Sequence, residues 1–292
     1  MKHAIVVVVT VTGCGRLGFD PEVLLDATAT ARCDPEQPFG PLVALPRLSS
    51  PGADIGVELA DDGLTGFMWS DRLGIDRIYE TSRTTRDAEL ATPRLVDALI
   101  APGYADRDPC PSGDGLSLVF ASQRPGGGGG GWDLWLATRA SRAAELEAPT
   151  PVTATNNAAE NWGPYLTSSG LALYYVEGAD LRVSRRASTS DEFTTVSVLG
   201  TLNTSFSEFE PTVTPDELTI YFASDRGGRG LDLYVATRAS IDASFDEPTL
   251  VGELSSGADD IPSWVAPDLC EIQMTQSNGA TGWDLYYARR PL

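Results

Sequence analysis

The sequence predicts an all-β protein, a five-bladed β-propeller whose blades are four-stranded antiparallel sheets. One motif recurs five times along the chain, and each copy ends in an arginine. Successive copies end 56, 47, 52 and 52 residues apart, a spacing that fits four strands with turns. Apolar residues alternate within the copies, which is the period of a strand and not of a helix. The closing arginines are Arg83, Arg139, Arg186, Arg238 and Arg290.

The clearest copy of the motif covers residues 210–238, and residues 112–139 follow it closely. Weaker copies begin at Asp61-Asp62-Gly63, Ser168-Ser169-Gly170 and Pro267-Asp268. Blade-sized spacing between all five copies predicts one sheet per copy, with a sixth, degenerate blade as the alternative.

Four strands are expected in each copy. An innermost strand comes first, and a Pro-Asp or Gly-Asp-Gly hairpin follows because Asp and Gly tolerate the backbone of tight turns. The second strand alternates apolar residues, as in Leu218, Ile220 and Phe222. Asp-Leu-Tyr or a variant forms the third strand, and an outer strand follows each arginine, as in residues 245–251.

The fifth copy ends at Leu292 without an outer strand of its own. Residues 39–45, followed by Ser49-Ser50, parallel residues 245–251, followed by Ser255-Ser256. We therefore expect the N-terminal strand to join the last blade, because that pairing closes the ring and removes open sheet edges.

Ser/Thr-Pro-Asp-Gly, Phe-Ala-Ser-Asp-Arg, Gly-Gly and Asp-Leu-Tyr together resemble the PD40 repeat, the WD40-like propeller repeat of TolB-type periplasmic proteins. The resemblance covers roughly residues 39–292. The third copy departs from it, with Glu177-Gly178 in place of Ser-Asp-Arg, and the fifth has Gln276-Ser277-Asn278 there. The resemblance implies the fold, and it implies no shared binding face. No segment resembles the separate N-terminal α/β domain of TolB.

The N-terminus resembles an export signal. Met1-Lys2-His3 precedes a short apolar run, and Val11-Thr12-Gly13-Cys14 resembles a bacterial lipobox, whose cysteine becomes lipidated. Gly15 then implies sorting to the outer membrane. We expect a signal peptide at 1–14, a linker at 15–38 and a propeller at 39–292, exported and attached to the membrane only through acyl chains on Cys14. The alternative is an ordinary first strand of a cytosolic protein.

The other three cysteines do not have metal-site spacing. An exported protein could oxidise one pair of them and leave one thiol free, and the sequence does not choose the pair. Buried, small apolar side chains are the alternative for Cys110 and Cys270. The three are Cys33, Cys110 and Cys270.

Charge and histidine content exclude several functions. The chain carries 41 acidic and 21 basic residues, a formal charge of −20, so its field repels nucleic acids. His3, in the expected signal peptide, is the only histidine. The mature chain therefore has no Ser-His-Asp or Cys-His system and no histidine-containing zinc site. We expect no cofactor, with Ca²⁺ held by oxygen ligands as the open option.

Acidic residues near the starts of the innermost strands are the candidate binding residues, because those strands surround the channel of a propeller. Crowded at one mouth, they could bind Ca²⁺, a sugar or a cationic peptide; solvated turn caps are the alternative. Trp162 and Trp264 are the candidates for an exposed recognition surface, whereas Trp132 and Trp283 are expected to pack between blades. The acidic candidates are Asp54, Asp108, Glu210 and Asp260, with Glu160 close to the third copy.

These observations predict a non-enzymatic envelope lipoprotein whose propeller binds a protein or a cell-wall or extracellular glycan. The alternative is a carbohydrate-active enzyme, similar to a glycoside hydrolase, that uses channel carboxylates. Binding is favoured because the acids recur at repeat positions, as structural residues would. A purely structural or adhesive module is the third option.

Overall fold

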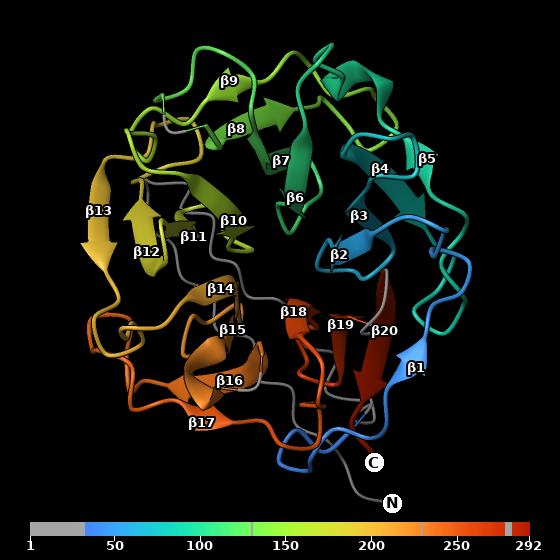
Figure 1. The fold of residues 1–292 in the computed structure, drawn as a ribbon, viewed down its shortest axis with the longest axis vertical. Coiled ribbons are helices and arrows are strands. Elements are labelled where there is room, and N and C mark those ends of the chain that lie inside the picture. The colour runs from blue at the N-terminus through green and yellow to red at the C-terminus, as the bar shows by residue number, and fades with distance from the viewer. Residues whose placement is uncertain (1–32, 130, 229, 278–281) are drawn as a thin grey trace, which may run out of the picture. The chain divides into compact units, whose positions relative to one another are not determined.

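Five antiparallel sheets stand around a central axis in a computed structural model of the chain, which describes residues 33–129, 131–228, 230–277 and 282–292 (Figure 1). The predicted five-bladed propeller is confirmed. The expected signal peptide, Cys14 and most of the expected linker lie outside the described residues. Among the described residues, no helix is long and apolar enough to cross a bilayer.

Each blade has four strands, which follow one another from the channel outward. Blade 1 contains β2 (Asp54–Leu59), β3 (Thr65–Ser70), β4 (Arg77–Ser82) and β5 (Arg94–Leu95). Blade 2 contains β6 (Asp106–Pro111), β7 (Ser117–Ser122), β8 (Asp133–Thr138) and β9 (Thr150–Pro151). Blade 3 contains β10 (Asn161–Leu166), β11 (Ala172–Glu177), β12 (Asp180–Arg185) and β13 (Thr195–Val198).

The last two blades follow the same order. Blade 4 contains β14 (Glu208–Val213), β15 (Thr219–Ser224), β16 (Asp232–Thr237) and β17 (Thr249–Leu250). Blade 5 contains β18 (Asp260–Val265), β19 (Glu271–Ser277), β20 (Trp283–Arg289) and β1 (Val43–Ala44). Short 3-10 turns occupy Asp97–Leu99 and Asp225–Gly227.

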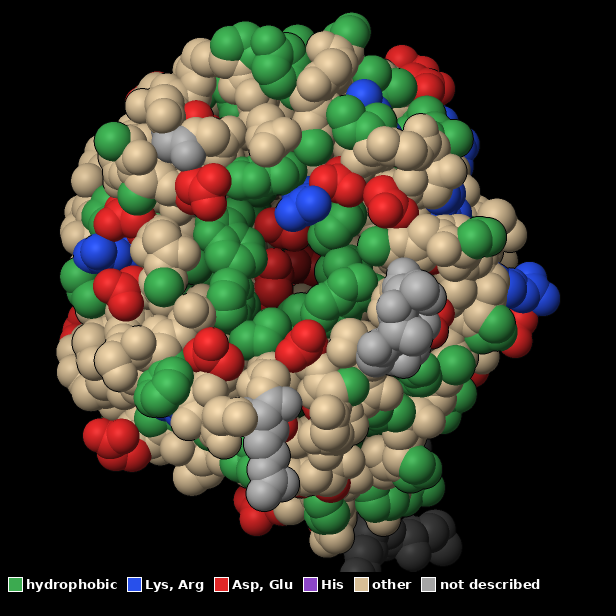
Figure 2. Space-filling model, in the orientation of Figure 1, with side chains coloured by type: hydrophobic (Ala, Val, Ile, Leu, Met, Phe, Trp, Pro, Cys, Tyr) green, Lys and Arg blue, Asp and Glu red, His purple; other side chains and the backbone are tan. Residues whose placement is uncertain are grey.

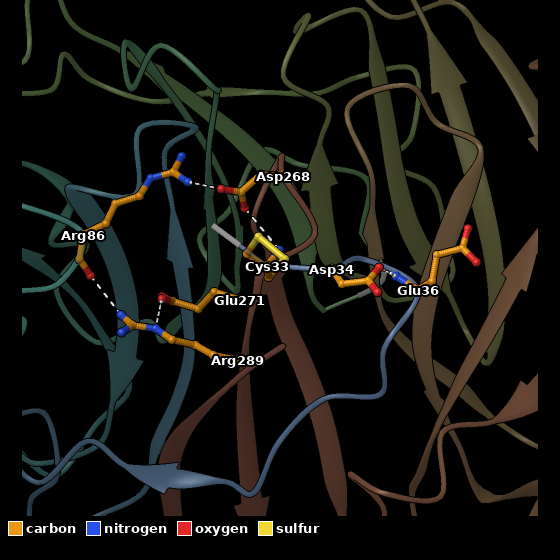
Figure 3. The surroundings of a disulfide bond; sticks show 8 residues. Cys33, Asp34, Glu36, Arg86, Asp268, Glu271 and Arg289 are labelled. Carbon is orange, nitrogen blue, oxygen red and sulfur yellow. Dashed lines mark hydrogen bonds and ion pairs between the residues drawn. A yellow bond between two sulfur atoms is a disulfide. The ribbon is translucent and has the colours of Figure 1, made fainter. Parts of the chain in front are cut away.

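Ring closure takes place in blade 5, as the sequence predicts. β1 pairs antiparallel with β20, so that Val43 faces Tyr287 and Ala44 faces Tyr286. A disulfide between Cys33 and Cys270 ties the segment before β1 to the same blade (Figure 3). Of the three pairings left open by the sequence, the structure thus has Cys33 with Cys270, and Cys110 is a buried thiol.

The Ser-Asp-Arg motif fastens the innermost strand to its blade. Arg124 in blade 2 forms an ion pair with the first residue of β6, Asp106, at 2.7 Å, and its guanidinium lies over the rings of Phe120 and Trp135. Arg226 and Glu208 make the equivalent pair in blade 4 at 3.0 Å, and Arg72 pairs with Asp54 in blade 1. The repeated acid at this position is therefore structural.

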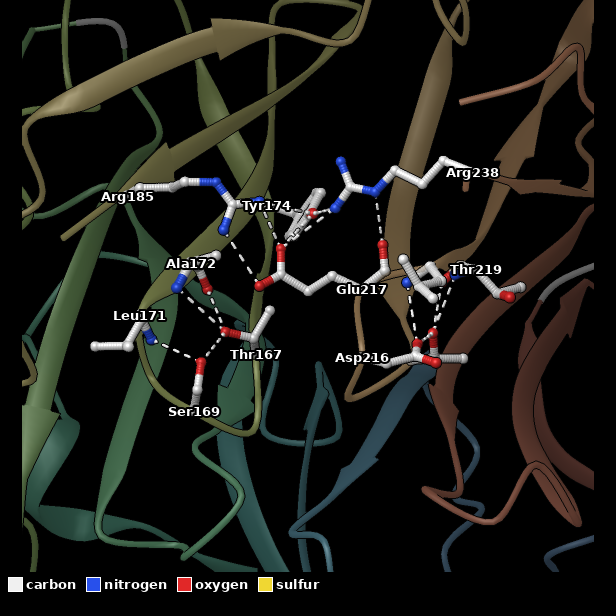
Figure 4. A network of polar contacts seen from close by, with 12 residues as sticks. Thr167, Ser169, Leu171, Ala172, Tyr174, Arg185, Asp216, Glu217, Thr219 and Arg238 are labelled. Atoms are coloured by element: carbon white, nitrogen blue, oxygen red, sulfur yellow. Dashed lines mark hydrogen bonds and ion pairs between the residues drawn. The ribbon is translucent and has the colours of Figure 1, made fainter. Parts of the chain in front are cut away.

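The closing arginines fasten the hairpins in a similar way. Arg238 donates from Nε to the backbone carbonyl of Glu217, at 2.7 Å. Glu217 also accepts from Tyr174 and Arg185 of blade 3, at 2.7 and 2.6 Å, so one buried carboxylate joins blades 3 and 4 (Figure 4). Arg83, Arg139 and Arg186 make the equivalent backbone contact in blades 1, 2 and 3.

Candidate functional site

Every innermost strand is interrupted by a β-bulge, and the bulge directs side chains into the channel. In blades 1 and 3 the third residue of the strand is a glycine with positive φ: 67° at Gly56 and 54° at Gly163. In blades 2 and 4 it is an acid with the same left-handed backbone: 50° at Asp108 and 46° at Glu210. In non-glycine residues this conformation costs about 1 kcal/mol or more, and such strain is concentrated at functional sites.

Asp108 and Glu210 converge on Gly163, which lies between them. The Gly163 N–H donates to Asp108 Oδ2 at 3.2 Å. A Cβ placed on Gly163 would lie 3.3 Å from Glu210 Oε1, so the glycine leaves room for the carboxyl group of blade 4. Together these contacts place the two carboxyl oxygens within about 9 Å of each other. Blades 2 and 4 thus direct two acids toward Gly163 of blade 3.

Burial makes these carboxyl groups hard to ionise. It raises the pKa of Asp108 to about 6, and the N–H of Gly163 partly opposes the shift. Burial raises the pKa of Glu210 well above its ordinary value, and the nearby carboxyl groups of Asp108 and Glu58 raise it further. Burial also raises the pKa of Glu58, a third acid beside Asp108. Desolvation with like-charge neighbours is the arrangement that active and binding sites commonly show.

Two buried polar atoms near these acids have no hydrogen-bond partner among the described residues. They are Oε2 of Glu58 and Oγ1 of Thr212. Glu58 is 5% exposed and Thr212 1%. Buried polar groups are nearly always satisfied, so unpaired ones call for a bound polar molecule or ordered water.

One mouth of the channel opens into a cavity of ≈ 440 Å³ above the acids. This volume lies in the range of about 300–1,000 Å³ that small-molecule sites occupy. Figure 2 shows acidic side chains at the bottom of the hollow, hydrophobic side chains on its wall and a basic group at its rim. Four tryptophans line it: Trp69, Trp132, Trp162 and Trp283. We call this cavity the aromatic funnel.

Arg107 is the basic residue of the funnel. Its guanidinium lies between two indole rings, 4.6 Å from the centre of Trp69 and 4.8 Å from that of Trp132. Its Nε forms an ion pair with Asp76 at 2.7 Å. Arg107 is thus held in place by both kinds of contact, with its charge compensated.

The hairpins narrow the other end of the channel. Ser168 of blade 3 donates to Asp61 of blade 1 at 2.8 Å, and the Asp61 N–H donates to the Gly113 carbonyl of blade 2 at 3.0 Å. Because blades 1 and 3 are not neighbours, the contact between Ser168 and Asp61 crosses the channel. The funnel is therefore open at one mouth of the channel.

The structure separates the acids that the sequence pattern treats as equivalent. Asp54 and Asp260 occupy the first position of their strands, fully buried; Asp54 pairs with Arg72, and Asp260 accepts from Gln276 at 2.6 Å. Asp108 and Glu210 occupy the third position and line the funnel. The expectation that all four crowd one mouth is corrected, because the bulge shifts the register between these positions. Glu160 does line the funnel.

The tryptophans also divide differently from the prediction. Trp162 lines the funnel, with its ring 4.9 Å from that of Phe209. Trp264 is 3% exposed and packs in the apolar core with residues of blade 1, so it is not an exposed recognition residue. Trp132 and Trp283, expected to pack between blades, line the funnel and are partly exposed. A tryptophan precedes the repeated Asp of the third strand only in blades 2 and 5. This departure from the repeat was the signal in the sequence that could have identified Trp132 and Trp283 as funnel residues.

The described residues contain no group of three or more His, Cys, Asp or Glu side chains arranged to hold a metal ion. Glu58 was missed by the sequence pattern because other residue types occupy its position in the other blades.

No protein-family model and no curated protein matches this chain. Solved structures do resemble it in fold. TolB from Acinetobacter baumannii is 14% identical with a TM-score of 0.51, over 84% of this chain and 57% of that one. This chain therefore spans just over half the length of that TolB structure. The catalytic domain of the Coprinopsis cinerea GH62 α-L-arabinofuranosidase is 10% identical with a TM-score of 0.54, over 87% and 97%.

A third structure is the α-L-arabinofuranosidase PaAbf62A from Podospora anserina in complex with cellotriose, 11% identical with a TM-score of 0.54, over 88% and 98% of the two chains. At these identities the resemblance shows the propeller fold alone, which binding proteins and enzymes share.

Proposed function

We propose that this protein binds the end of a glycan chain in the aromatic funnel. The observation that supports this most directly is the combination of four indole rings on the wall with the carboxyl groups of Asp108 and Glu210 at the bottom. The C–H faces of a sugar ring are apolar and pack against aromatic faces, while its hydroxyls donate to carboxylates. The narrowed lower end of the channel favours a chain end over a chain that passes through.

The test is isothermal titration calorimetry of the full-length protein against a panel of neutral, acidic and amino oligosaccharides. We expect one class to bind and Trp162→Ala to weaken that binding at least about tenfold, because the sugar loses its packing partner. Tyr287→Ala is the matched control, since Tyr287 lies in the outer groove beside β1. If no oligosaccharide binds, or if both variants lose affinity equally, the glycan proposal is wrong. The proposed ligand of the funnel is then a protein partner.

Hydrolysis of the bound glycan is the second candidate, favoured by the different surroundings of Asp108 and Glu210. Glu210 accepts no hydrogen bond from a described residue, and burial raises its pKa, which is the direction that a general acid requires. Asp108 accepts a hydrogen bond from the Gly163 N–H, which favours its ionised form, as suits a base or nucleophile. The carboxyl oxygens of Asp108 and Glu210 lie within about 9 Å of each other, a limit that includes the carboxyl separations of both retaining and inverting glycosidases.

Release of reducing ends from the bound oligosaccharide tests this candidate. Glu210→Gln and Asp108→Asn should each abolish release while leaving binding measurable. If the wild-type protein binds the oligosaccharide and releases no reducing ends, hydrolysis is wrong and glycan binding alone stands.

We also propose export and anchoring through Cys14, on the lipobox-like sequence Val11-Thr12-Gly13-Cys14. Cys14→Ser should move the protein from the membrane fraction to the soluble fraction of the source cells. Unchanged partitioning would contradict the lipid anchor.

A further inference from the structure

We propose that the sugar at the bottom of the funnel carries a free primary ammonium group, so that the ligand is an amino sugar chain without N-acetylation at its end. This inference rests on the proposed glycan function and names the class of glycan.

The first argument is the charge of the funnel. Five carboxyl groups line it against a single guanidinium. That guanidinium, on Arg107, forms an ion pair with Asp76 at 2.7 Å. Its charge is therefore already compensated at the rim. The five acids are Asp71, Asp76, Asp108, Glu160 and Glu210.

The second argument is a contrast within the same strands. The acids at the first position each have a fixed partner: Asp106 has Arg124, and Glu208 has Arg226. Neither Asp108 nor Glu210 forms an ion pair with any described residue. Together with Glu58, whose Oε2 is buried without a partner among the described residues, they place three carboxyl groups near the one guanidinium of Arg107, which is already paired with Asp76. An entering cation would give them the ion-pair partner that the acids of the first position have.

The third argument is that the funnel wall already accommodates a cation. The Arg107 guanidinium lies over the faces of Trp69 and Trp132. Cations are attracted to the negative faces of indole rings, most strongly where water is excluded. The partly exposed Trp162 and Trp283 offer the same kind of surface to a ligand.

A primary ammonium group fits better than other cations. It carries three N–H donors, which can reach the carboxyl groups of Asp108 and Glu210 together, whereas a quaternary ammonium has none. N-acetylation would remove both the charge and two of the donors. The rest of the sugar ring would remain free to pack on the indoles.

The experiment compares three tetrasaccharides with the same β-1,4 backbone by calorimetry on the full-length protein: the glucosamine tetramer, the N-acetylglucosamine tetramer and cellotetraose. Ethanolamine serves as a cation without a glycan. We expect the glucosamine tetramer to bind at least about tenfold more tightly than the other three ligands, because a desolvated charge pair supported by the indole wall forms only with it.

Two variants assign the preference to the acids. Glu210→Gln should weaken binding of the glucosamine tetramer at least about tenfold and change cellotetraose binding little. Asp108→Asn serves in the same way if the first variant does not fold, and asparagine tolerates the left-handed backbone well. Glu147→Gln, at an exposed position outside the funnel, is the matched control and should bind as the wild type does.

The outcomes separate the two proposals. Equal or tighter binding of cellotetraose or of the N-acetylated tetramer overturns the amino sugar inference and leaves glycan binding standing. Ethanolamine binding as tightly as the glucosamine tetramer overturns the inference in favour of a simple cation site. No binding by any of the tetrasaccharides overturns the amino sugar inference, and the wider panel with acidic oligosaccharides then decides whether the protein binds a glycan at all.

Discussion

Two positions of the innermost strand, two residues apart, differ in what they do. At the first position blades 1, 2, 4 and 5 carry a buried acid, whereas blade 3 has Asn161, and the acids are paired within their blades. At the third position blades 1 and 3 have glycine, while blades 2 and 4 have Asp108 and Glu210. The acids at the repeated first position stabilise the blades. Asp108 and Glu210, which depart from the repeat, line the funnel. In a propeller, departure from the repeat is therefore the better guide to the site.

The largest expected effect is at the first position. Asp106→Ala should lower the free energy of unfolding by about 3–5 kcal/mol, because Arg124 keeps its charge in a largely buried place without a partner. Chemical denaturation measures this loss. Asn161→Ala is the matched change in blade 3 and should cost about 1 kcal/mol, since it removes a neutral hydrogen bond to the Ala159 carbonyl. Equal costs would contradict the structural role of the ion pair.

Removing the disulfide should lower the stability of the propeller and leave the ligand affinity of the funnel unchanged. The double variant Cys33→Ala, Cys270→Ala should lose about 2–4 kcal/mol of stability, because the bond closes a loop with a sequence separation of 237 residues. Ligand affinity of the folded protein should stay the same. A reducing agent should destabilise the wild type and leave the double variant unchanged; a loss in both would assign the effect to something other than this bond.

The acids of the third position should make stability fall as pH rises. The pKa of Asp108 is about 6 in the folded protein, above that of an unfolded aspartate, so the folded state binds more protons between about pH 4 and 6. The contribution of Asp108 to stability is thus fully present below this range and is lost, by about 2–3 kcal/mol, across it. The charged groups that face Asp108 are Glu58, Glu210, Asp76 and Arg107.

Denaturation curves of the wild type and Asp108→Asn at several pH values isolate this contribution. The difference in stability between the two proteins should change with pH across this range. A constant difference for Asp108→Asn would contradict the raised pKa.

The smallest expected effect is an increase in stability, whereas most mutations lower stability. Glu210→Gly gives blade 4 the glycine of blades 1 and 3, so we expect a gain of about 1 kcal/mol from relief of the left-handed backbone and of a buried carboxyl group. Thermal unfolding at neutral pH measures it. Gly163→Ala should do the opposite, because φ is 54° there and the new Cβ would lie 3.3 Å from Glu210. A loss of stability in Glu210→Gly would show that Glu210 supports the fold.

Much of the fold was predictable because its signals are local. Alternation of Leu218, Ile220 and Phe222 predicts a strand regardless of its neighbours, and the similarity of residues 39–45 to 245–251 predicts the closing strand. The pairing of Cys33 with Cys270 was not predictable, because it depends on where the two chain segments meet in blade 5.

The site was predictable only in part. The carboxyl groups of Asp108 and Glu210 were correctly placed beside the channel, but Asp54 and Asp260 were grouped with them, although they are buried within their own blades. Trp264 was predicted to be exposed because the sequence does not show whether a tryptophan on an innermost strand faces the surface or packs against a neighbouring blade. Its burial follows from packing against residues of blade 1, which are distant in sequence.

The number of blades, their strand order and the closure of the ring could all be read from the chain, because strand periodicity and repeated turns are properties of short segments. The meeting of acids from blades 2 and 4 at Gly163 of blade 3 came only from the folded arrangement. Its cause is the β-bulge, which shifts the register between the first and third positions of the strand. The bulge turns the third side chain into the channel, and no alternation of residue types records that shift.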